Sequence, residues 1–451
     1  ILGFDDWLPT PSVNSTGENT FWSGYHEGYD FYNAENLIPA TGVVKMYSQK
    51  RYIQSILWAR KFDDADSNKV YLMGISAGGM GPYLTANLIP EKVTAAYCVA
   101  GNFKLVTIAN DDTQPEQMWG TLATNLNSDV LNPETGVAIP VFSLFDIREM
   151  LAINKNQNMP LIFCVYGKND QTIFWTSYTV SLSDSLEHNH IGGKFFWDQR
   201  EHDGSGQNFN DAETMPDWYS YANNISYPAF SNCTINQDLG DGTPANGAAY
   251  GAINGYLDYT KDNVTDATCN ITYKIKIIDL LVGGVPNPVQ YNTCFADVTV
   301  RRAQNFHPSI GETIKWNNFD SSNAKIQNGS FVYNGGLITI SGVQINKSGN
   351  RLDIKISNCA KEGDDEISET SLPEITFQNA GSAYLVSIKN LPDEVISLSV
   401  VNIIGETVLN KIISGKSGDC QFQLPQLSSG IYIISLRGTN FSLSKKLFAS
   451  H

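Results

Sequence analysis

The sequence lacks long apolar runs, and none approaches the length needed to cross a bilayer. Its seven cysteines form no CxxC motif and no Cys/His pairing, so we expect no zinc or other metal site. Basic residues are scarce, with 30 Lys and Arg against 46 Asp and Glu, and the net charge is −16. A protein that follows a nucleic-acid backbone or a polyanionic membrane would carry a basic face, so neither partner is expected.

Length and composition indicate several folded domains. A chain of 451 residues exceeds what one hydrophobic core usually organises. With 42% hydrophobic and 17% charged residues, it is typical of a globular protein. Shifts in composition divide it into an α/β domain at 1–224, a β-rich module at 225–360, a linker at 361–373 and a small β domain at 374–451.

The first zone alternates short apolar runs with helical patterns. Residues 70–73, 93–99, 161–166 and 194–197 are compact and largely apolar, as strands buried on both faces of a parallel sheet are. Residues 46–60 place apolar side chains on one face of a helix. Strands alternating with helices predict an α/β fold class.

The later zones are rich in short alternating runs and turn residues, which predict two all-β, sandwich-like domains. Charged and small residues mark 361–373 as a linker. The four cysteines from Cys233 to Cys359 are expected to form one or two disulfides if the compartment is oxidising, and the sequence does not pair them.

One motif points to nucleophilic catalysis. Gly74-Ile75-Ser76-Ala77-Gly78 is the chain's only G-x-S-x-G, and it follows the strand at 70–73 and precedes a helix-forming stretch at 80–88. A strand, a sharp turn and a helix are the context in which this motif presents a nucleophilic serine. We therefore predict Ser76 as nucleophile and the backbone N–H of Ala77 as an oxyanion donor. The alternative is an ordinary glycine-rich turn.

A serine hydroxyl needs a base, and the base needs an orienting acid. In this fold class the order along the chain is nucleophile, acid, histidine, each after a later strand. Asp170 and His202 occupy those positions after the strands at 161–166 and 194–197. Asp184 and Asp198 are weaker candidates for the acid. The other histidines lie at a helix end, outside the α/β zone or before Ser76: His188, His190, His307, His451 and His26.

Aromatic residues crowd the segment 21–32. Rings on a loop near the strand ends would stack on a sugar or an aromatic acyl group, which makes Trp22 and Tyr25 candidate substrate contacts. Trp175, shortly after Asp170, is a third candidate. The equally weighted alternative is that these rings pack a long surface loop.

With these motifs, residues 1–224 resemble the α/β-hydrolase superfamily, in its secreted polymer-esterase and prolyl-oligopeptidase-like branches. The resemblance implies a doubly wound sheet and ester hydrolysis through an acyl-enzyme without a cofactor. It also implies that Ile1–Phe4 is the strand before the helix at 46–60. The family's earlier strands, and the loop that supplies a second oxyanion N–H, are then expected to precede Ile1.

The end of the chain resembles the type A sorting domain of the bacterial type IX secretion system. The matching pieces are Val401-Asn402-Ile403-Ile404-Gly405, Leu427-Ser428-Ser429-Gly430-Ile431-Tyr432 and Lys445-Lys446-Leu447-Phe448. The resemblance implies contact with the type IX machinery and export across the outer membrane of a Bacteroidetes-type bacterium.

Together these features predict a secreted serine hydrolase that cleaves carboxylic esters, with extracellular polymer such as acylated polysaccharide as its substrate. One alternative is a secreted serine peptidase of the prolyl-oligopeptidase type, which shares the three side chains. Another is a catalytically inactive surface-binding protein on a hydrolase scaffold.

Overall fold

The computed structural model describes the chain in ranges separated by gaps. These are residues 1–8, 18–33, 35–104, 113–205, 218–282, 285–287, 290–359, 374–379, 384–391, 395–402, 407–414, 418–424, 427–428, 430–437 and 442–449. They form two compact units, 1–359 and 360–451, and each is described by itself. The predicted linker at 361–373 and the turn around Gly405 lie outside the described residues.

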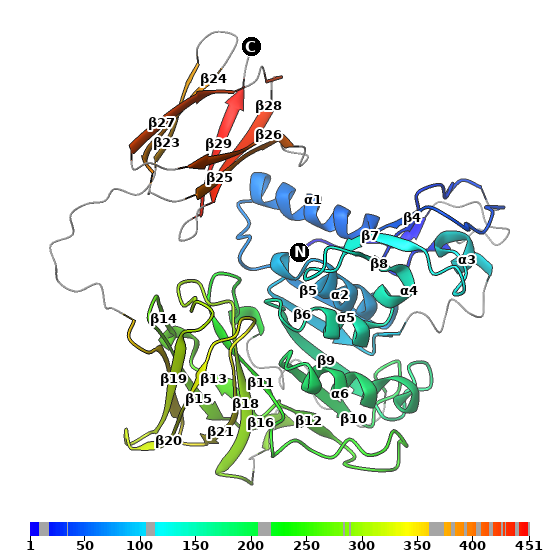
Figure 1. Cartoon of the computed structure of the whole chain (residues 1–451). Helices are drawn as coiled ribbons and strands as arrows, with labels where there is room; N and C mark the ends of the chain where they lie inside the picture. Colours follow the sequence, from blue (N-terminus) through cyan, green and yellow to red (C-terminus); the bar gives the residue numbers. More distant parts are fainter. Residues whose placement is uncertain are drawn as a thin grey trace. The chain divides into compact units, whose positions relative to one another are not determined.

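A mostly parallel sheet forms the centre of the first unit (Figure 1). Its order is β12-β10-β9-β6-β5, and only β12 runs antiparallel to its neighbour. The strands are β5 (Tyr71–Ile75), β6 (Ala95–Val99), β9 (Leu161–Gly167), β10 (Gly193–Asp198) and β12 (Gly251–Ile253). Every residue of β6, β9 and β10 is buried, which explains their near-continuous apolar sequences.

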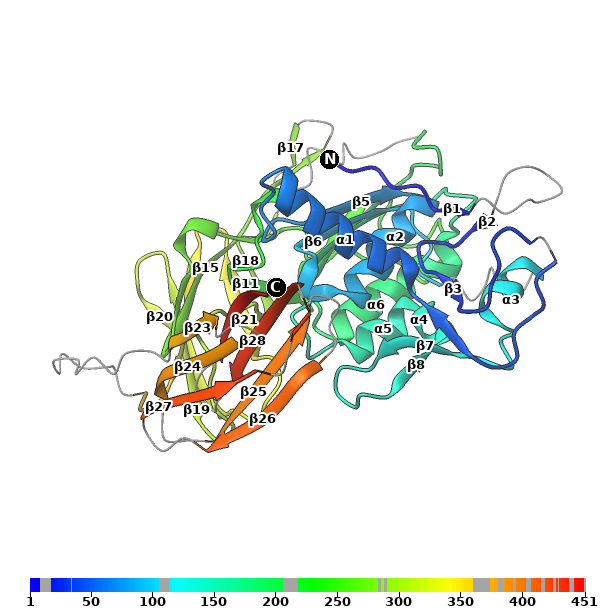
Figure 2. The same ribbon diagram turned by 90° about the horizontal axis from the view of Figure 1, so that it is seen from above.

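The two faces of this sheet pack against different structures. On one face, Cys98, Cys164 and Trp197 share a core with helices α2, α5 and α6. On the other face, Phe163 and Phe196 share a core with β strands from the second half of the unit. Helix α1 lies beside α2 (Figure 2). The helices are α1 (Tyr47–Phe62), α2 (Ala77–Leu88), α3 (Thr113–Trp119), α4 (Val141–Leu144), α5 (Ile147–Ile153) and α6 (Val180–His188).

The α/β sheet predicted from the sequence is therefore present. The doubly wound arrangement stays a prediction, because in the described residues the second face contacts strands rather than helices. A small peripheral sheet, of order β3-β4-β7-β8, and a short pair, β1-β2, extend the first half of the unit. These strands are β1 (Trp7–Leu8), β2 (Glu18–Asn19), β3 (Tyr25–His26), β4 (Val43–Lys45), β7 (Asn127–Leu131) and β8 (Ala138–Pro140).

The strands between residues 225 and 359, here called the β-module, form two antiparallel sheets and a separate antiparallel pair, β16-β17, while strand β12 joins the central sheet. One has the order β11-β18-β21, and the other has the order β13-β15-β22-β19-β20 with β14 paired to β15. The strands are β11 (Tyr227–Ser231), β13 (Leu257–Tyr259), β14 (Thr265–Ala267), β15 (Asn270–Ile277), β16 (Leu280–Val282), β17 (Val285–Asn287), β18 (Thr293–Arg301), β19 (Thr313–Asp320), β20 (Lys325–Val332), β21 (Thr339–Asn346) and β22 (Asn350–Ile356). A disulfide joins Cys269 to Cys359.

The second unit is also a two-sheet β structure with its own buried core. Its sheets have the orders β23-β24-β27 and β26-β25-β28-β29. The strands are β23 (Glu374–Asn379), β24 (Tyr384–Leu391), β25 (Val395–Asn402), β26 (Thr407–Ser414), β27 (Gly418–Gln423), β28 (Gly430–Arg437) and β29 (Ser442–Ala449).

The expectation that Ile1–Phe4 forms a strand is wrong. Residues 1–6 carry no strand, and the Phe4 ring packs edge-on against Tyr52 of helix α1, with 4.7 Å between ring centroids. This contact directs the segment onto α1 instead of into a ladder with β5. Met73 and Ile75 of β5, the edge strand of the sheet, are more than half exposed.

Two buried arginines connect the β-module to the rest of the first unit. Arg301 donates to the carbonyls of His190 and Gln157, and Arg302 donates to the carbonyl of Val93 over 2.5 Å. Burial lowers the pKa of Arg301 to about 10 and also lowers the pKa of Arg302. Both side chains therefore stabilise the junction through hydrogen bonds to backbone carbonyls.

We predict that Arg302→Leu lowers the free energy of unfolding by about 2–4 kcal/mol, because the carbonyls that accept from its guanidinium lose a charged donor inside the protein. Urea unfolding of both proteins measures the change. Lys355→Met, at an exposed position on β22, is the matched control and should change stability by less than about 0.5 kcal/mol. Equal effects of the two substitutions would contradict a special role for Arg302.

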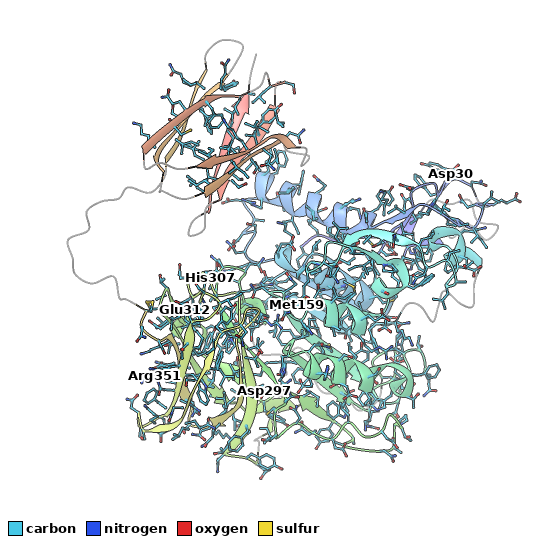
Figure 3. All side chains as sticks on the ribbon, viewed as in Figure 1. Asp30, Met159, Asp297, His307, Glu312 and Arg351 are labelled. Atoms are coloured by element: carbon cyan, nitrogen blue, oxygen red, sulfur yellow. A yellow bond between two sulfur atoms is a disulfide. The ribbon has the colours of Figure 1, made fainter. Side chains whose placement is uncertain are left out.

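A half-buried carboxyl group lies near the end of α6. Glu187 accepts hydrogen bonds from the Asn232 backbone and the Asn254 side chain, each over 2.5 Å. Burial outweighs these bonds and raises the pKa of Glu187 to about 7. Asp297 of β18, which is labelled in Figure 3, adds to the rise. Between the ordinary glutamate pKa and about 7, the folded protein holds a proton that the unfolded chain has lost.

This difference predicts that the contribution of Glu187 to stability falls as pH rises from about 4.5 to about 7. Glu187→Gln should remove that slope. The free energy of unfolding of the variant, taken relative to that of the original chain, should therefore be about 2–3 kcal/mol higher at pH 8 than at pH 5. Urea unfolding at both pH values provides the comparison. A stability difference between the two proteins that does not vary with pH would refute the assignment.

Candidate active site

Ser76 lies on a sharp turn between β5 and α2. Its backbone has φ +56°, a region that residues other than glycine rarely adopt. The glycines beside it are required by space: a Cβ on Gly74 would lie 1.9 Å from the carbonyl oxygen of Gly78, and one on Gly79 would lie 2.8 Å from that of Val99. The turn therefore lifts the Ser76 side chain off the end of the strand.

The structure brings the three side chains singled out in the sequence into one hydrogen-bonded chain. Ser76 Oγ lies 2.6 Å from His202 Nε2, and His202 Nδ1 lies 2.8 Å from Asp170 Oδ2. The other oxygen of Asp170 accepts the backbone N–H groups of Thr172 and Ile173. The Asp170 side chain is buried, whereas that of His202 is about a quarter exposed.

This network assigns the histidine tautomer. An ionised Asp170 only accepts hydrogen bonds, so the proton of neutral His202 belongs on Nδ1. Nε2 then presents its lone pair to the Ser76 hydroxyl. The arrangement can take a proton from the serine and hold it on the imidazole.

The other candidate acids either bond to another residue or are exposed to solvent. Asp198 forms an ion pair with Arg200 over 2.5 Å, and both side chains are buried. Asp184 is exposed. Asp203, next to His202, accepts the backbone N–H of Ser205, and hydrogen bonds from Ser205 lower its pKa.

The remaining described histidines lie in other surroundings. His26 Nε2 is 2.9 Å from the carbonyl oxygen of Thr41, and His307 Nε2 is 3.1 Å from that of Gln304. His190 Nδ1 lies 3.0 Å from Ser231 Oγ, and His188 is the last residue of α6. His451 lies outside the described residues.

Ala77 is the first residue of α2. The first N–H groups of a helix have no partner within the helix, and they lie at the positive end of its dipole. The indole of Trp22 donates to the Ala77 carbonyl oxygen over 2.7 Å. Trp22 thus packs on the first turn of α2, directly after Ser76.

The aromatic candidates separate into two groups. Trp22 and Tyr25 are partly buried, and Tyr25 packs against Tyr47 with 4.6 Å between ring centroids. Trp175 is a correction to the sequence-based assignment: its side chain is 1% exposed and belongs to the core between the sheet and the helices. Its side chain therefore has too little exposed surface to contact a substrate. The neighbouring Phe174 is nearly half exposed instead.

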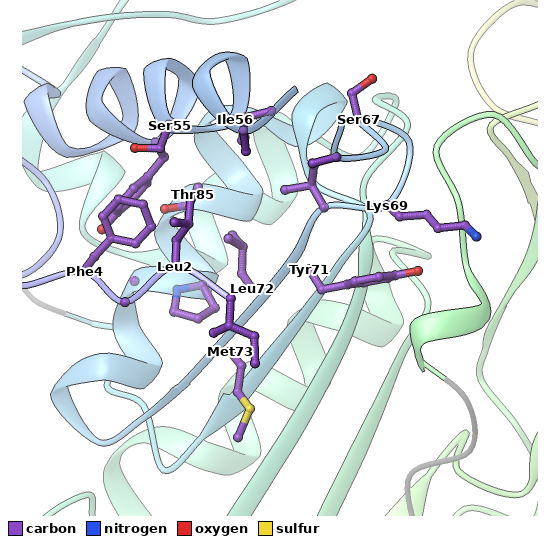
Figure 4. Close-up of a pocket in the computed structure, with 18 of the residues that line it drawn as sticks. Leu2, Phe4, Ser55, Ile56, Ser67, Lys69, Tyr71, Leu72, Met73 and Thr85 are labelled. Carbon is purple, nitrogen blue, oxygen red and sulfur yellow. The ribbon is translucent and has the colours of Figure 1, made fainter. Parts of the chain in front are cut away.

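A cavity of about 580 Å³ lies beside the turn, between α1, α2, β5 and residues 1–4 (Figure 4). Leu2, Phe4, Ile56 and Met73 contribute to its mainly apolar wall. None of Ser76, Asp170 or His202 lines it, so it is separate from the hydrogen-bonded chain.

Comparison with known proteins identifies the tail. Residues 382–450 match the family described as the secretion system C-terminal sorting domain. The tail marks the protein for export. The type IX route therefore carries it to the cell surface or the medium. Among the described residues, no helix combines the length and apolar character needed to span a membrane.

No curated protein matches the chain. Among solved structures, a fluorophosphonate-binding serine hydrolase F (FphF) from Staphylococcus aureus is 16% identical, with a TM-score of 0.27, over 35% of this chain and 56% of that one. The S-formylglutathione hydrolase FrmB from the same organism is 13% identical, with a TM-score of 0.25, over 35% and 54%.

A β-glucuronidase from Ruminococcus gnavus is 13% identical, with a TM-score of 0.15, over 41% of this chain and 35% of that one. The chain thus spans a little over half the length of the two staphylococcal enzymes. Because every one of these TM-scores is below 0.5, these likenesses do not determine the function of the chain.

We predict that Asp170→Asn lowers the rate at which Ser76 reacts with a fluorophosphonate by about 10³- to 10⁴-fold, because an amide favours the wrong tautomer of His202. The matched control is Asp203→Asn, which removes a neighbouring exposed carboxylate. It should change the rate by less than about threefold. A loss in the control as large as in Asp170→Asn would show that the acid is misassigned.

Proposed function

We propose that the protein is a secreted serine hydrolase that cleaves carboxylic esters through an acyl-enzyme. The observation that carries the proposal is the continuous hydrogen-bonded chain from Ser76 through His202 to Asp170. A hydroxyl, an imidazole and a buried carboxylate in this order are the parts that nucleophilic acyl transfer needs.

The first half of the reaction forms the acyl-enzyme. Ser76 Oγ attacks the ester carbonyl carbon while His202 Nε2 takes the hydroxyl proton. The backbone N–H of Ala77 donates to the oxyanion that develops on the carbonyl oxygen. The C–O bond to the alcohol then breaks, and His202 returns the proton to the leaving alkoxide.

The second half releases the acid. Water loses a proton to His202 Nε2 and attacks the acyl carbon, and the Ser76 oxygen leaves and regains that proton. Asp170 stays ionised throughout and stabilises the imidazolium in each half.

For the substrate, we propose extracellular polymer such as acylated polysaccharide. The export tail places the enzyme outside the cell, where polymer is available. Trp22 and Tyr25 remain the proposed substrate contacts, and the exposed ring of Phe174 takes the place of Trp175.

The decisive variant is Ser76→Ala in the full-length protein. It should abolish fluorophosphonate labelling and lower hydrolysis of p-nitrophenyl acetate by about 10⁴- to 10⁶-fold. Ser185→Ala is the control, because its hydroxyl only donates to the Ser181 carbonyl within α6, and it should keep full activity.

Two further outcomes separate the alternatives. Turnover of a dipeptide nitroanilide with no release of acetate or hydroxycinnamate from acylated polysaccharide would indicate a peptidase. Failure of the original protein to label at Ser76 would indicate a binding protein on a hydrolase scaffold.

A further inference from the structure

Two cysteine side chains face the same core from adjacent segments of the β-module. Cys233 follows β11, and Cys294 is the second residue of β18. β11 pairs with β18, and beyond β11 the Thr234 backbone N–H donates to the Phe295 carbonyl oxygen over 2.9 Å. Thr234 and Phe295 are exposed, so the alternation of side chains directs both cysteines inward.

The two thiols lie close enough to influence each other. Both side chains are buried in the same core, and their interaction lowers the pKa of Cys233 and raises that of Cys294. A disulfide between them needs this proximity and not a particular order of attack, because either thiolate can be the nucleophile in disulfide exchange.

We propose that Cys233 and Cys294 form a second disulfide in the exported protein, beside the Cys269–Cys359 bond. The sorting tail takes the chain through the periplasm, which is oxidising. The β-module already contains one cross-link, so its cysteines meet conditions in which sulfur–sulfur bonds persist. This inference does not depend on the proposed catalytic activity.

A second cysteine pair in the same unit is the internal comparison. Cys98 of β6 and Cys164 of β9 are directly paired across the parallel sheet. They lie in the α/β half and not in the module that contains the Cys269–Cys359 cross-link, and burial raises the pKa of both thiols. We expect these two to stay as thiols.

The oxidation needs a disulfide-containing oxidant, which we take to be an oxidised thiol–disulfide oxidoreductase in the cell or glutathione disulfide in vitro. The thiolate of one of the two cysteines attacks one sulfur of the oxidant, and the other sulfur of the oxidant leaves as a thiolate. The thiolate of the second cysteine then attacks the mixed disulfide at the sulfur of the first cysteine and displaces the remaining oxidant thiolate. The two cysteines lose two electrons and two protons, and the oxidant gains them. Since both sulfurs are buried in the folded protein, the exchange takes place before the β-module core closes.

The test uses the full chain, refolded with glutathione disulfide until the Cys269–Cys359 bond is complete. The protein is unfolded without reduction, alkylated with N-ethylmaleimide and mapped by mass spectrometry of its peptides. We expect a cross-linked peptide pair containing Cys233 and Cys294, and we expect Cys98 and Cys164 to be alkylated. Recovery of Cys233 and Cys294 as alkylated thiols, or linked to other cysteines, would overturn the proposal.

Variants refine this result. In Cys294→Ser, Cys233 should become fully alkylated and the thermal midpoint should fall by several degrees, because the unfolded chain loses a cross-link. In Cys98→Ser, the cross-linked pair should persist. If Cys294→Ser does not fold, the mapping of the original chain still decides the question.

Discussion

The candidate site depends on the alignment of four parallel strands, three of which, β5, β9 and β10, are followed by its residues. Ile75 at the end of β5 is level with Val99 of β6, which is level with Val165 of β9, and Gly167 is paired with Asp198 of β10. Parallel pairing brings all their carboxyl ends to one edge of the sheet. Ser76, Asp170 and His202 come one, three and four residues after these strands end, so short loops are enough to join them.

The β-module also stabilises the central sheet that carries the candidate site. It covers the sheet face opposite to helices α2, α5 and α6, and its strand β12 extends the sheet beyond β10. The buried guanidinium groups of Arg301 and Arg302 tie the module to backbone carbonyls of the α/β half. The module therefore contributes to the core that holds the strands of the candidate site.

Much of the site was predictable from the sequence because its determinants are local. Buried parallel strands are apolar without interruption, and the residues just after them must lie at one edge, which identified Ser76, Asp170 and His202 together. The inward direction of Trp175 was not predictable, because it depends on where the next helix packs. The same holds for the strand expected at Ile1–Phe4, since the contact of Phe4 with Tyr52 is not visible in periodicity. The packing of the β-module and the pairing of cysteines are contacts between distant segments, and a single sequence does not encode them in any local pattern.

A crystal structure of the full-length protein inhibited by a fluorophosphonate would test the central claim most directly. The account predicts a covalent bond from phosphorus to Ser76 Oγ, with a phosphoryl oxygen 2.7–3.1 Å from the Ala77 nitrogen. It also predicts that His202 still bonds to Asp170. An adduct on another residue, or a phosphoryl oxygen turned away from Ala77 with His202 displaced from Asp170, would contradict it.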